Sequence, residues 1–390
     1  MQKCNRTIHF AFVAIAIIVM PWGVAFGDSI TVTAGGYVKN MVMHAEFGGY
    51  SSFTDEIQGR LNTAWYYGDA FSAAIEGRVI VVVPNNNSIV PLLFSSVNSE
   101  NTYNRPAILD VDRAWLRYTN GPVQITAGEQ RIAWGTNLVW NVIDIFNPYN
   151  VLDFDYEERP AALAVRAQIF TGALTNVDVV WQPVPLTQFG VTPPRSIAAQ
   201  FTTSIARYDV HVMAAKFDGA WAGGTAWVGG VAWAGDICGA GFRGEAKYEY
   251  GLGEQVKDSI YYYRWDQTLR QRAFNAALSL DYTFPSSLYL HLEAKYINLS
   301  RDPGGFSSSA YYPRWSNFFE VAYNISPLVR GDAIAIAYPD DGSFVVMPGV
   351  TWSVVTDIDL TFLAMRYNKH LPSGGMDNSW LAMGRVRWAF

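Results

Sequence analysis

The histidines are the first residues to consider for chemistry, because histidine is a common general base and metal ligand. Beyond residue 27 they are His44, His211, His291 and His370. None stands in H-E-x-x-H, in G-x-S-x-G or in a spaced metal cluster. His291 is two residues from Glu293, so on a strand the two would share a face and could serve a Ser/His hydrolase site. A histidine of structural role is the favoured interpretation, and we expect neither an enzyme nor a metal site.

The two cysteines offer little further chemistry. Cys4 lies near the N-terminus and Cys238 is the only cysteine beyond residue 27, so an exported chain could form no intramolecular disulfide. The chain contains no C-x-x-C-H sequence, and so attaches no c-type haem. We therefore expect no cofactor.

The composition indicates which elements must position the charged residues. Of 390 residues, 50% are apolar, 15% are aromatic and only 16% are charged, with a mean hydropathy of +0.06. Beyond residue 27 the longest apolar run is Ala333 to Tyr338, six residues, whereas a membrane helix needs about 20. Dispersed apolar residues in so apolar a chain favour a transmembrane β-barrel, in which lipid-facing residues alternate with polar ones.

The alternation assigns faces to individual segments. Between Phe274 and Phe284 the apolar residues take every even position, and Asn275, Ser279 and Asp281 take odd ones. Short turns are predicted near 68–69, 120–121, 171–172, 207, 235–239, 285–287, 326–327 and 356–357, separated by loops near 46–54, 85–108, 135–160, 184–195, 217–220, 251–270, 298–314, 339–343 and 368–377. The segments between them predict an all-β, antiparallel up-and-down barrel of about 18 strands; 16 is the alternative.

The two ends of the chain carry patterns of their own. Residues 1–27 combine Lys3 and Arg6 with an apolar stretch and Ala25-Phe26-Gly27, which predicts a cleaved signal peptide before a barrel of residues 28–390. A retained anchor is the alternative. Without 1–27 the formal charge is −8, with 26 Lys and Arg against 34 Asp and Glu, which disfavours nucleic-acid binding. At the other end, Trp388 and Phe390 close an alternating strand that resembles the assembly signal of bacterial outer-membrane barrels.

A six-residue repeat predicts one further membrane-spanning strand. Residues 220–237 contain three copies of a unit that begins A-W, and the even period places Trp221, Trp227 and Trp233 on one face. Tryptophan is favoured at membrane interfaces. A glycine-rich loop is the alternative.

Residues 128–148 break the alternation. Continuing the face of Ala127 would send Glu129 and Arg131 into lipid, so we expect a bulge or an exit from the bilayer near Gly128. The residues that follow are too apolar for a solvated loop. We therefore predict a constriction segment at 135–160 that folds into the lumen or caps its mouth; the residues assigned to the constriction are Trp134, Trp140, Asp144, Phe146, Asn147 and Pro148.

The same stretch resembles a known family. Its pattern of G-x-Q, W-G and D-x-x-N-P, carried by Gly128, Gln130, Trp134, Gly135, Asp144, Asn147 and Pro148, is similar to that of Gram-negative outer-membrane barrels of largely unassigned function, distantly similar to general and alginate-export porins. The commoner form G-R-Q is here Gly128-Glu129-Gln130. The resemblance implies a barrel with an inward-folded segment, and implies no substrate.

The inward face of this barrel would then line water. The residues predicted to line it are Arg60, Arg78, Arg113, Arg117, Arg166, Glu245, Asp281, Glu293 and Asp332. The basic members come mostly early and the acidic ones late, so two interpretations stay open: opposed walls with a transverse field, or charges paired across strands. Ion preference is not predicted.

These expectations lead to a function. We expect a porin-like channel for passive diffusion of small hydrophilic solutes or ions in the bacterial outer membrane. Its other partners would be outer-membrane lipid and the barrel assembly machinery. The alternative functions are a barrel that surrounds a lumen-filling lipoprotein or multihaem cytochrome, and a barrel enzyme acting on lipid or peptide through His291. Among the partners, a second copy of the chain in a homo-oligomer stays open.

Overall fold

The computed structural model describes residues 24–26, 30–47, 50–83, 107–147, 161–183, 195–219, 224–252, 272–298, 314–370 and 376–390. Over these residues, no helix is long and apolar enough to cross a membrane. Several predicted features lie wholly or largely outside the described residues: the leader 1–27, the constriction segment from Pro148 to 160, Trp221, and the loops 85–108, 184–195, 251–270 and 298–314.

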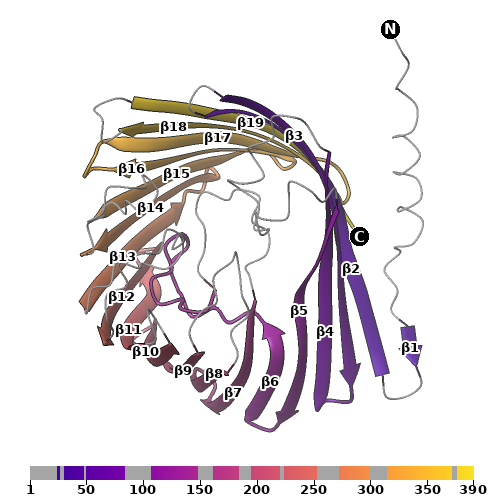
Figure 1. Ribbon diagram of the computed structural model, residues 1–390, viewed down its shortest axis with the longest axis vertical. Helices are drawn as coiled ribbons and strands as arrows, with labels where there is room; N and C mark the ends of the chain where they lie inside the picture. The colour runs from indigo at the N-terminus through magenta and orange to yellow at the C-terminus, as the bar shows by residue number, and fades with distance from the viewer. Residues whose placement is uncertain are drawn as a thin grey trace.

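The described chain is a sheet that closes on itself (Figure 1). Its strands are β1 (Val24–Phe26), β2 (Ile30–Phe47), β3 (Tyr50–Tyr67), β4 (Phe71–Val83), β5 (Ala107–Asn120), β6 (Val123–Gln130), β7 (Ala162–Gly172), β8 (Thr175–Gln182), β9 (Arg195–Ile205), β10 (Tyr208–Gly219), β11 (Gly224–Ile237), β12 (Ala240–Leu252), β13 (Arg272–Thr283), β14 (Leu288–Ile297), β15 (Trp315–Ser326), β16 (Val329–Tyr338), β17 (Ser343–Val355), β18 (Ile358–His370) and β19 (Met376–Ala389).

Eighteen of these strands, β2 to β19, form the barrel. Each pairs antiparallel with the next along the chain, and β19 pairs with β2 to close the ring. The closure is completed by the last residue, because the backbone of Phe390 exchanges two hydrogen bonds of 2.9 and 3.0 Å with Gly36. The predicted fold and the count of 18 are confirmed, and the alternative of 16 is wrong.

The strands alternate between two faces. On β3, Thr54, Glu56 and Arg60 point inward and are at most 6% exposed, whereas Phe53 and Leu61 point outward and are 46% and 47% exposed. On β11, Trp227 is outward and 52% exposed, as the repeat predicts. The outer surface is therefore apolar and suits lipid, where a charged side chain would cost about 2–4 kcal/mol at the midplane.

The turns follow the prediction on one rim and depart from it on the other. A short turn joins each of the eight predicted strand pairs, from β3–β4 to β17–β18, and several contain residues with positive φ such as Gly68, Gly121 and Asp357. On the opposite rim, the prediction of a loop at 46–54 is wrong. β2 extends to Phe47 and β3 begins at Tyr50, so most of these residues belong to strands. The residues between the predicted loop at 184–195 and the predicted turn at 207 form a strand, β9.

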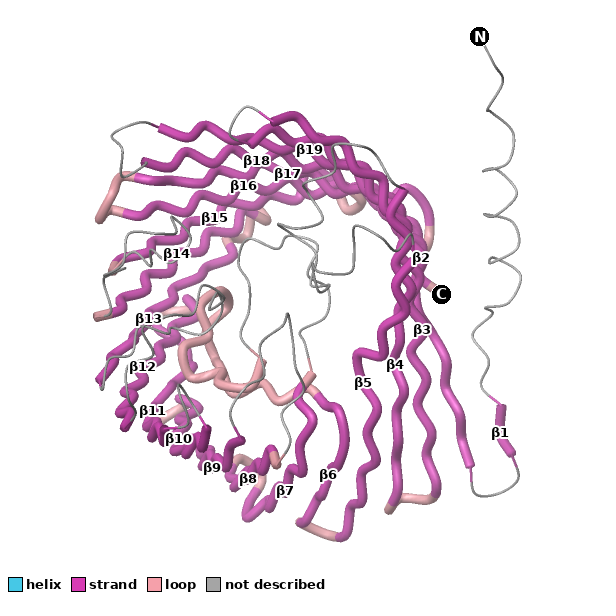
Figure 2. Tube along the Cα trace, viewed as in Figure 1, coloured by secondary structure: helices cyan, strands magenta, loops and turns pink. Residues whose placement is uncertain are grey.

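β1 is a short addition outside the closed ring. It pairs with Ile30–Val32 of β2, below the point where β19 ends. It lies within the residues expected to form a leader. Figure 2 shows it at the outer side of the barrel, beside the first residues of β2.

Candidate functional site

The most distinctive feature of the lumen is the segment 131–147, called here the inward segment. It leaves the wall where β6 ends at Gln130 and lies inside the ring of strands (Figures 1 and 2). It consists of loops and turns. It therefore begins four residues before the predicted boundary at 135.

Gly128 and Gln130 shape the point at which the chain leaves the wall. Gly128 has a φ of +119°, and a Cβ there would lie 2.3 Å from the carbonyl oxygen of Ala114, so only glycine fits. The Gln130 side chain is 3% exposed and donates from Nε2 to the carbonyl oxygens of Thr126 and Ala164, both at 3.1 Å. Gln130 thus ties the end of β6 to β7.

Glu245 of β12 binds the backbone of the inward segment. Its carboxylate accepts hydrogen bonds from the amides of Thr136 at 2.5 Å, Asn137 at 2.8 Å and Ile143 at 2.8 Å. The residue is 1% exposed. A single carboxylate thereby draws two separate turns of the segment onto the wall.

Glu293 of β14 makes the second such contact. It accepts hydrogen bonds from the amides of Val139 at 3.2 Å and Trp140 at 2.5 Å, and it is 3% exposed. The Trp140 ring packs edge-on against Phe318 and lies under the Lys295 ammonium, which is 5.4 Å from its centroid. Charge-assisted hydrogen bonds of this kind are stronger than neutral ones, so the two carboxylates fix the segment's position.

The apolar side chains of the segment lie against small residues of the wall. Ile132, Trp134, Ile143, Ile145 and Phe146 are at most 8% exposed. The wall beneath them is contributed by β7 to β11; its small members are Ala162, Ala164, Ala198, Ala215 and Ala232. At Gly230 a Cβ would lie 3.0 Å from a methyl of Ile143. Small wall residues therefore leave the space that the segment fills.

The remaining residues of the predicted motif hold the segment's own shape. The Asn147 side-chain oxygen accepts from the amide of Ile132 at 2.6 Å, and Asp144 accepts from the amide of Asn147 at 3.2 Å. Trp134 donates its indole N–H to Asp178 of β8 at 3.0 Å. The same carboxylate binds Arg166. The structure thus brings together Trp134, Asp144, Phe146 and Asn147, all buried.

A second region of the inner wall, on β3 to β5, is a network of charged side chains. Arg60 contacts Glu76 at 2.8 Å and also Asp112, while Arg113 reaches Glu76 at 3.0 Å. Arg78 reaches Asp110 at 3.0 Å and Asp112 at 3.2 Å. A bulge opposite Glu76 and Gly77 puts Asp112 and Arg113 on the inward side together.

Three further predicted lining residues lie outside this network. Arg117 has no carboxylate partner among the described residues: it lies 4.6 Å from the Trp115 ring and donates to Thr126 at 3.1 Å. Asp332 of β16 is partly buried beside Gly349. Asp281 is paired with Arg243. Most predicted lining charges are therefore paired across strands, which favours that alternative over a transverse field.

The residues considered for catalysis lie together but are enclosed. His291 Nε2 is 3.1 Å from the Ser279 hydroxyl, and the histidine also contacts Glu293 and Glu320 at 3.4 and 3.6 Å. Both Ser279 and His291 are 1% exposed, and Glu293 is bound to the inward segment. Across the described strands and turns, no group of three or more His, Cys, Asp or Glu side chains could hold a metal ion.

At the end of β19, the Trp388 and Phe390 rings lie 5.3 Å apart.

Three aspartates that pair with the predicted arginines were not predicted from the sequence: Asp110, Asp112 and Asp178. Alternation was an available signal for Asp178 on β8, whereas Asp110 and Asp112 have the opposite parity to Arg113 and Arg117 and share their face only because of the bulge.

No family model and no curated protein matches the chain. Solved structures do. Acinetobacter baumannii OccAB3 superposes with a TM-score of 0.61 at 9% identity, covering 94% of this chain and 100% of that one. Pseudomonas aeruginosa OccK9 (OpdG) gives 0.61 at 8%, covering 92% and 98%. Pseudomonas aeruginosa OccK2 (OpdF), in complex with glucuronate, gives 0.58 at 9%, covering 92% and 98%.

At such low identity these similarities define a shared fold. The chain has the closed 18-strand antiparallel barrel of the Occ outer-membrane porins. The predicted porin-like architecture is confirmed, while the sequence motif and the substrate are not tested by it.

Proposed function

We propose that this protein is an outer-membrane channel through which small hydrophilic solutes diffuse passively. Three observations support this: the apolar outward face, the charged inward face, and the fold shared with porins of the Occ type. Barrels of about 16 or more strands enclose an aqueous lumen.

The inward segment carries the proposal. A barrel needs no internal segment for its own closure, yet this one binds 131–147 to β12 and β14 through two buried carboxylates. Such a segment narrows the lumen at a fixed place. We therefore assign the constriction to the inward segment, where Arg131 and Leu138 are its exposed side chains of appreciable size.

The opposite boundary of the path would be the β3–β5 network. Arg78 and Arg113 present fixed positive groups there, each compensated by a carboxylate, and the buried Arg60 holds the network together behind them. Such a wall offers both donors and acceptors, which suits neutral polar or zwitterionic solutes as well as ions. OccK2 is solved in complex with glucuronate, which is a small hydrophilic solute.

Single-channel conductance in planar bilayers tests the proposal. Refolded protein should give discrete conductance steps, and deletion of 136–158 should enlarge them because the constriction is lost. Absence of conductance from both proteins would overturn the channel. A protein that co-purifies in stoichiometric amount and closes the wild-type lumen would instead support the barrel as a sheath for a partner.

A further inference from the structure

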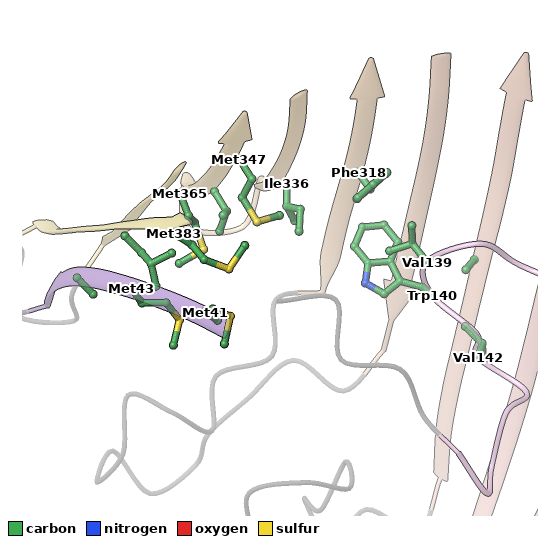
Figure 3. Packing of buried hydrophobic residues seen from close by; sticks show 14 residues of the cluster. Met41, Met43, Val139, Trp140, Val142, Phe318, Ile336, Met347, Met365 and Met383 are labelled. Atoms are coloured by element: carbon green, nitrogen blue, oxygen red, sulfur yellow. The ribbon is translucent and has the colours of Figure 1, made fainter. Parts of the chain in front are cut away.

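The methionines of this chain gather on one part of the inner wall. Beyond residue 27 the sequence has seven methionines. Five of them belong to one buried cluster, called here the methionine patch: Met41 and Met43 on β2, Met347 on β17, Met365 on β18 and Met383 on β19. Figure 3 shows their side chains side by side along these strands. Each is 2–5% exposed.

The pairing of the strands brings the thioethers within reach of one another. Met383 lies directly opposite Met43 across the β19–β2 pair, where facing Cβ atoms are about 5 Å apart. Met41 and Met43 are two residues apart, so both point to the same inward face. Met365 is opposite Leu381, one position along the same face of β19 from Met383. The patch therefore gathers sulfur atoms from four strands that are neighbours in the closed sheet.

Simple packing does not require sulfur at these positions. Elsewhere in the same cluster the wall uses Ile336, Val345 and Leu381, which supply apolar volume without a donor atom. Methionine differs from them in having a soft, polarizable thioether on a flexible chain that can adjust its position. Thioether ligands select soft monovalent ions such as Cu(I).

A polar atom at the edge of the patch also lacks a partner. Thr54 is directly opposite Met43 on β3 and is 0% exposed. Its hydroxyl has no hydrogen-bond partner among the described residues. An unsatisfied buried hydroxyl costs about 1–3 kcal/mol, so a bound species at the patch, with its water, would remove a real penalty.

We infer that the methionine patch is a binding site for a soft monovalent metal ion, Cu(I) or Ag(I), inside the lumen. A single positive charge carries a smaller desolvation cost than a divalent ion at so buried a place. The site goes beyond the proposed channel and does not depend on it.

Ag(I) is the probe, because it binds thioethers and needs no reductant. The parent for all measurements carries Cys4→Ser and Cys238→Ser, since both thiols of the chain, including the exposed Cys238, would bind silver themselves. Titration calorimetry, with silver counted by mass spectrometry after dialysis, should give a saturable site on the folded parent. Met43→Leu with Met383→Leu should weaken it by about tenfold or more while keeping apolar volume.

Met213→Leu is the matched control, because Met213 is equally buried on β10 but belongs to the other cluster. It should leave silver affinity unchanged. Heat-modifiable migration in gels confirms that each variant is folded. Equal affinity in the parent and the folded double variant, or no saturable binding by the parent, would overturn the inference and leave the patch as apolar packing.

Discussion

Two regions of the inner wall carry carboxylates, and they use them differently. On β3 to β5, Glu76 and Asp112 bind arginine side chains from neighbouring strands. On β12 and β14, Glu245 and Glu293 bind backbone amides of a segment more than 100 residues away in sequence. The first arrangement neutralises charge within the wall, and the second uses charge to hold a piece of chain in the lumen.

This difference indicates that one region mainly affects the stability of the barrel and the other mainly affects conduction through it. Arg60 has 1% of its side chain exposed, so its removal would leave Glu76 and Asp112 with one arginine partner each in place of two. Loss of Glu245 would instead release amides that can turn to lumen water once the segment moves. We therefore expect the network to govern stability and the two amide-binding carboxylates to govern conductance.

The largest effect is expected from Glu245→Ala combined with Glu293→Ala. The inward segment should detach from β12 and β14, and the single-channel conductance should rise about threefold because the lumen then lacks its constriction. Planar-bilayer recording measures this. Glu249→Ala on the same strand is the control, since Glu249 pairs with Lys247 and does not bind the segment through any described hydrogen bond. An unchanged conductance in the double variant would remove the assigned role of the two carboxylates.

Arg60→Ala should act on stability rather than on the segment. We expect a loss of about 3 kcal/mol in the free energy of unfolding, because Asp112 and Glu76 lose a buried partner. Urea titration in lipid or detergent measures the change. Adding Asp112→Ala to this variant should restore part of the stability, and a purely additive result would contradict the coupling.

Two neighbouring glycines provide a finer test. Gly230→Val should weaken the packing of the inward segment against the wall by about 2 kcal/mol in free energy, because a Cβ at Gly230 already meets Ile143 at 3.0 Å. The channel should also become noisier in bilayer recordings. Gly229→Val points to the open outer face, where a Cβ would meet nothing within 4 Å, and should have no such effect. Equal stability and equal channel noise in both variants would argue against close packing of the inward segment at Gly230.

The smallest effect is expected from Arg117→Ala. This arginine lacks a carboxylate partner among the described residues, so its removal should leave stability nearly unchanged. The ratio of cation to anion permeability, measured from reversal potentials in a salt gradient, should rise by about 1.5-fold. A fall in that ratio would contradict a lumen-facing positive group.

Much of the fold could be predicted because a barrel repeats one local rule. Alternation from Phe274 to Phe284 and turn residues at Gly68 and Asp357 are visible in a few neighbouring letters. The same locality explains the inward segment, since charges at Glu129 and Arg131 break the rule. It also explains why the loop predicted at 46–54 is wrong. Ser51 and Ser52 are polar residues typical of a loop, but they lie on β3, where Ser52 faces inward.

What could not be predicted depends on contacts between distant residues. The partnership of Arg60 with Asp112 spans 52 positions, and that of Glu245 with Thr136 spans 109. A carboxylate on an inward face gives no indication whether it meets water, arginine or a peptide amide. The bulge at Asp112 and Arg113 is hidden for the same reason, because register is set by the partner strand.

The way in which the inward segment is held has a consequence for protein engineering. Glu245 and Glu293 bind it through main-chain amides, which every residue except proline possesses. The exposed positions Arg131, Ala133 and Leu138 can therefore be exchanged without removing these bonds. A library restricted to these sites would vary what a passing solute meets while the scaffold beneath stays constant.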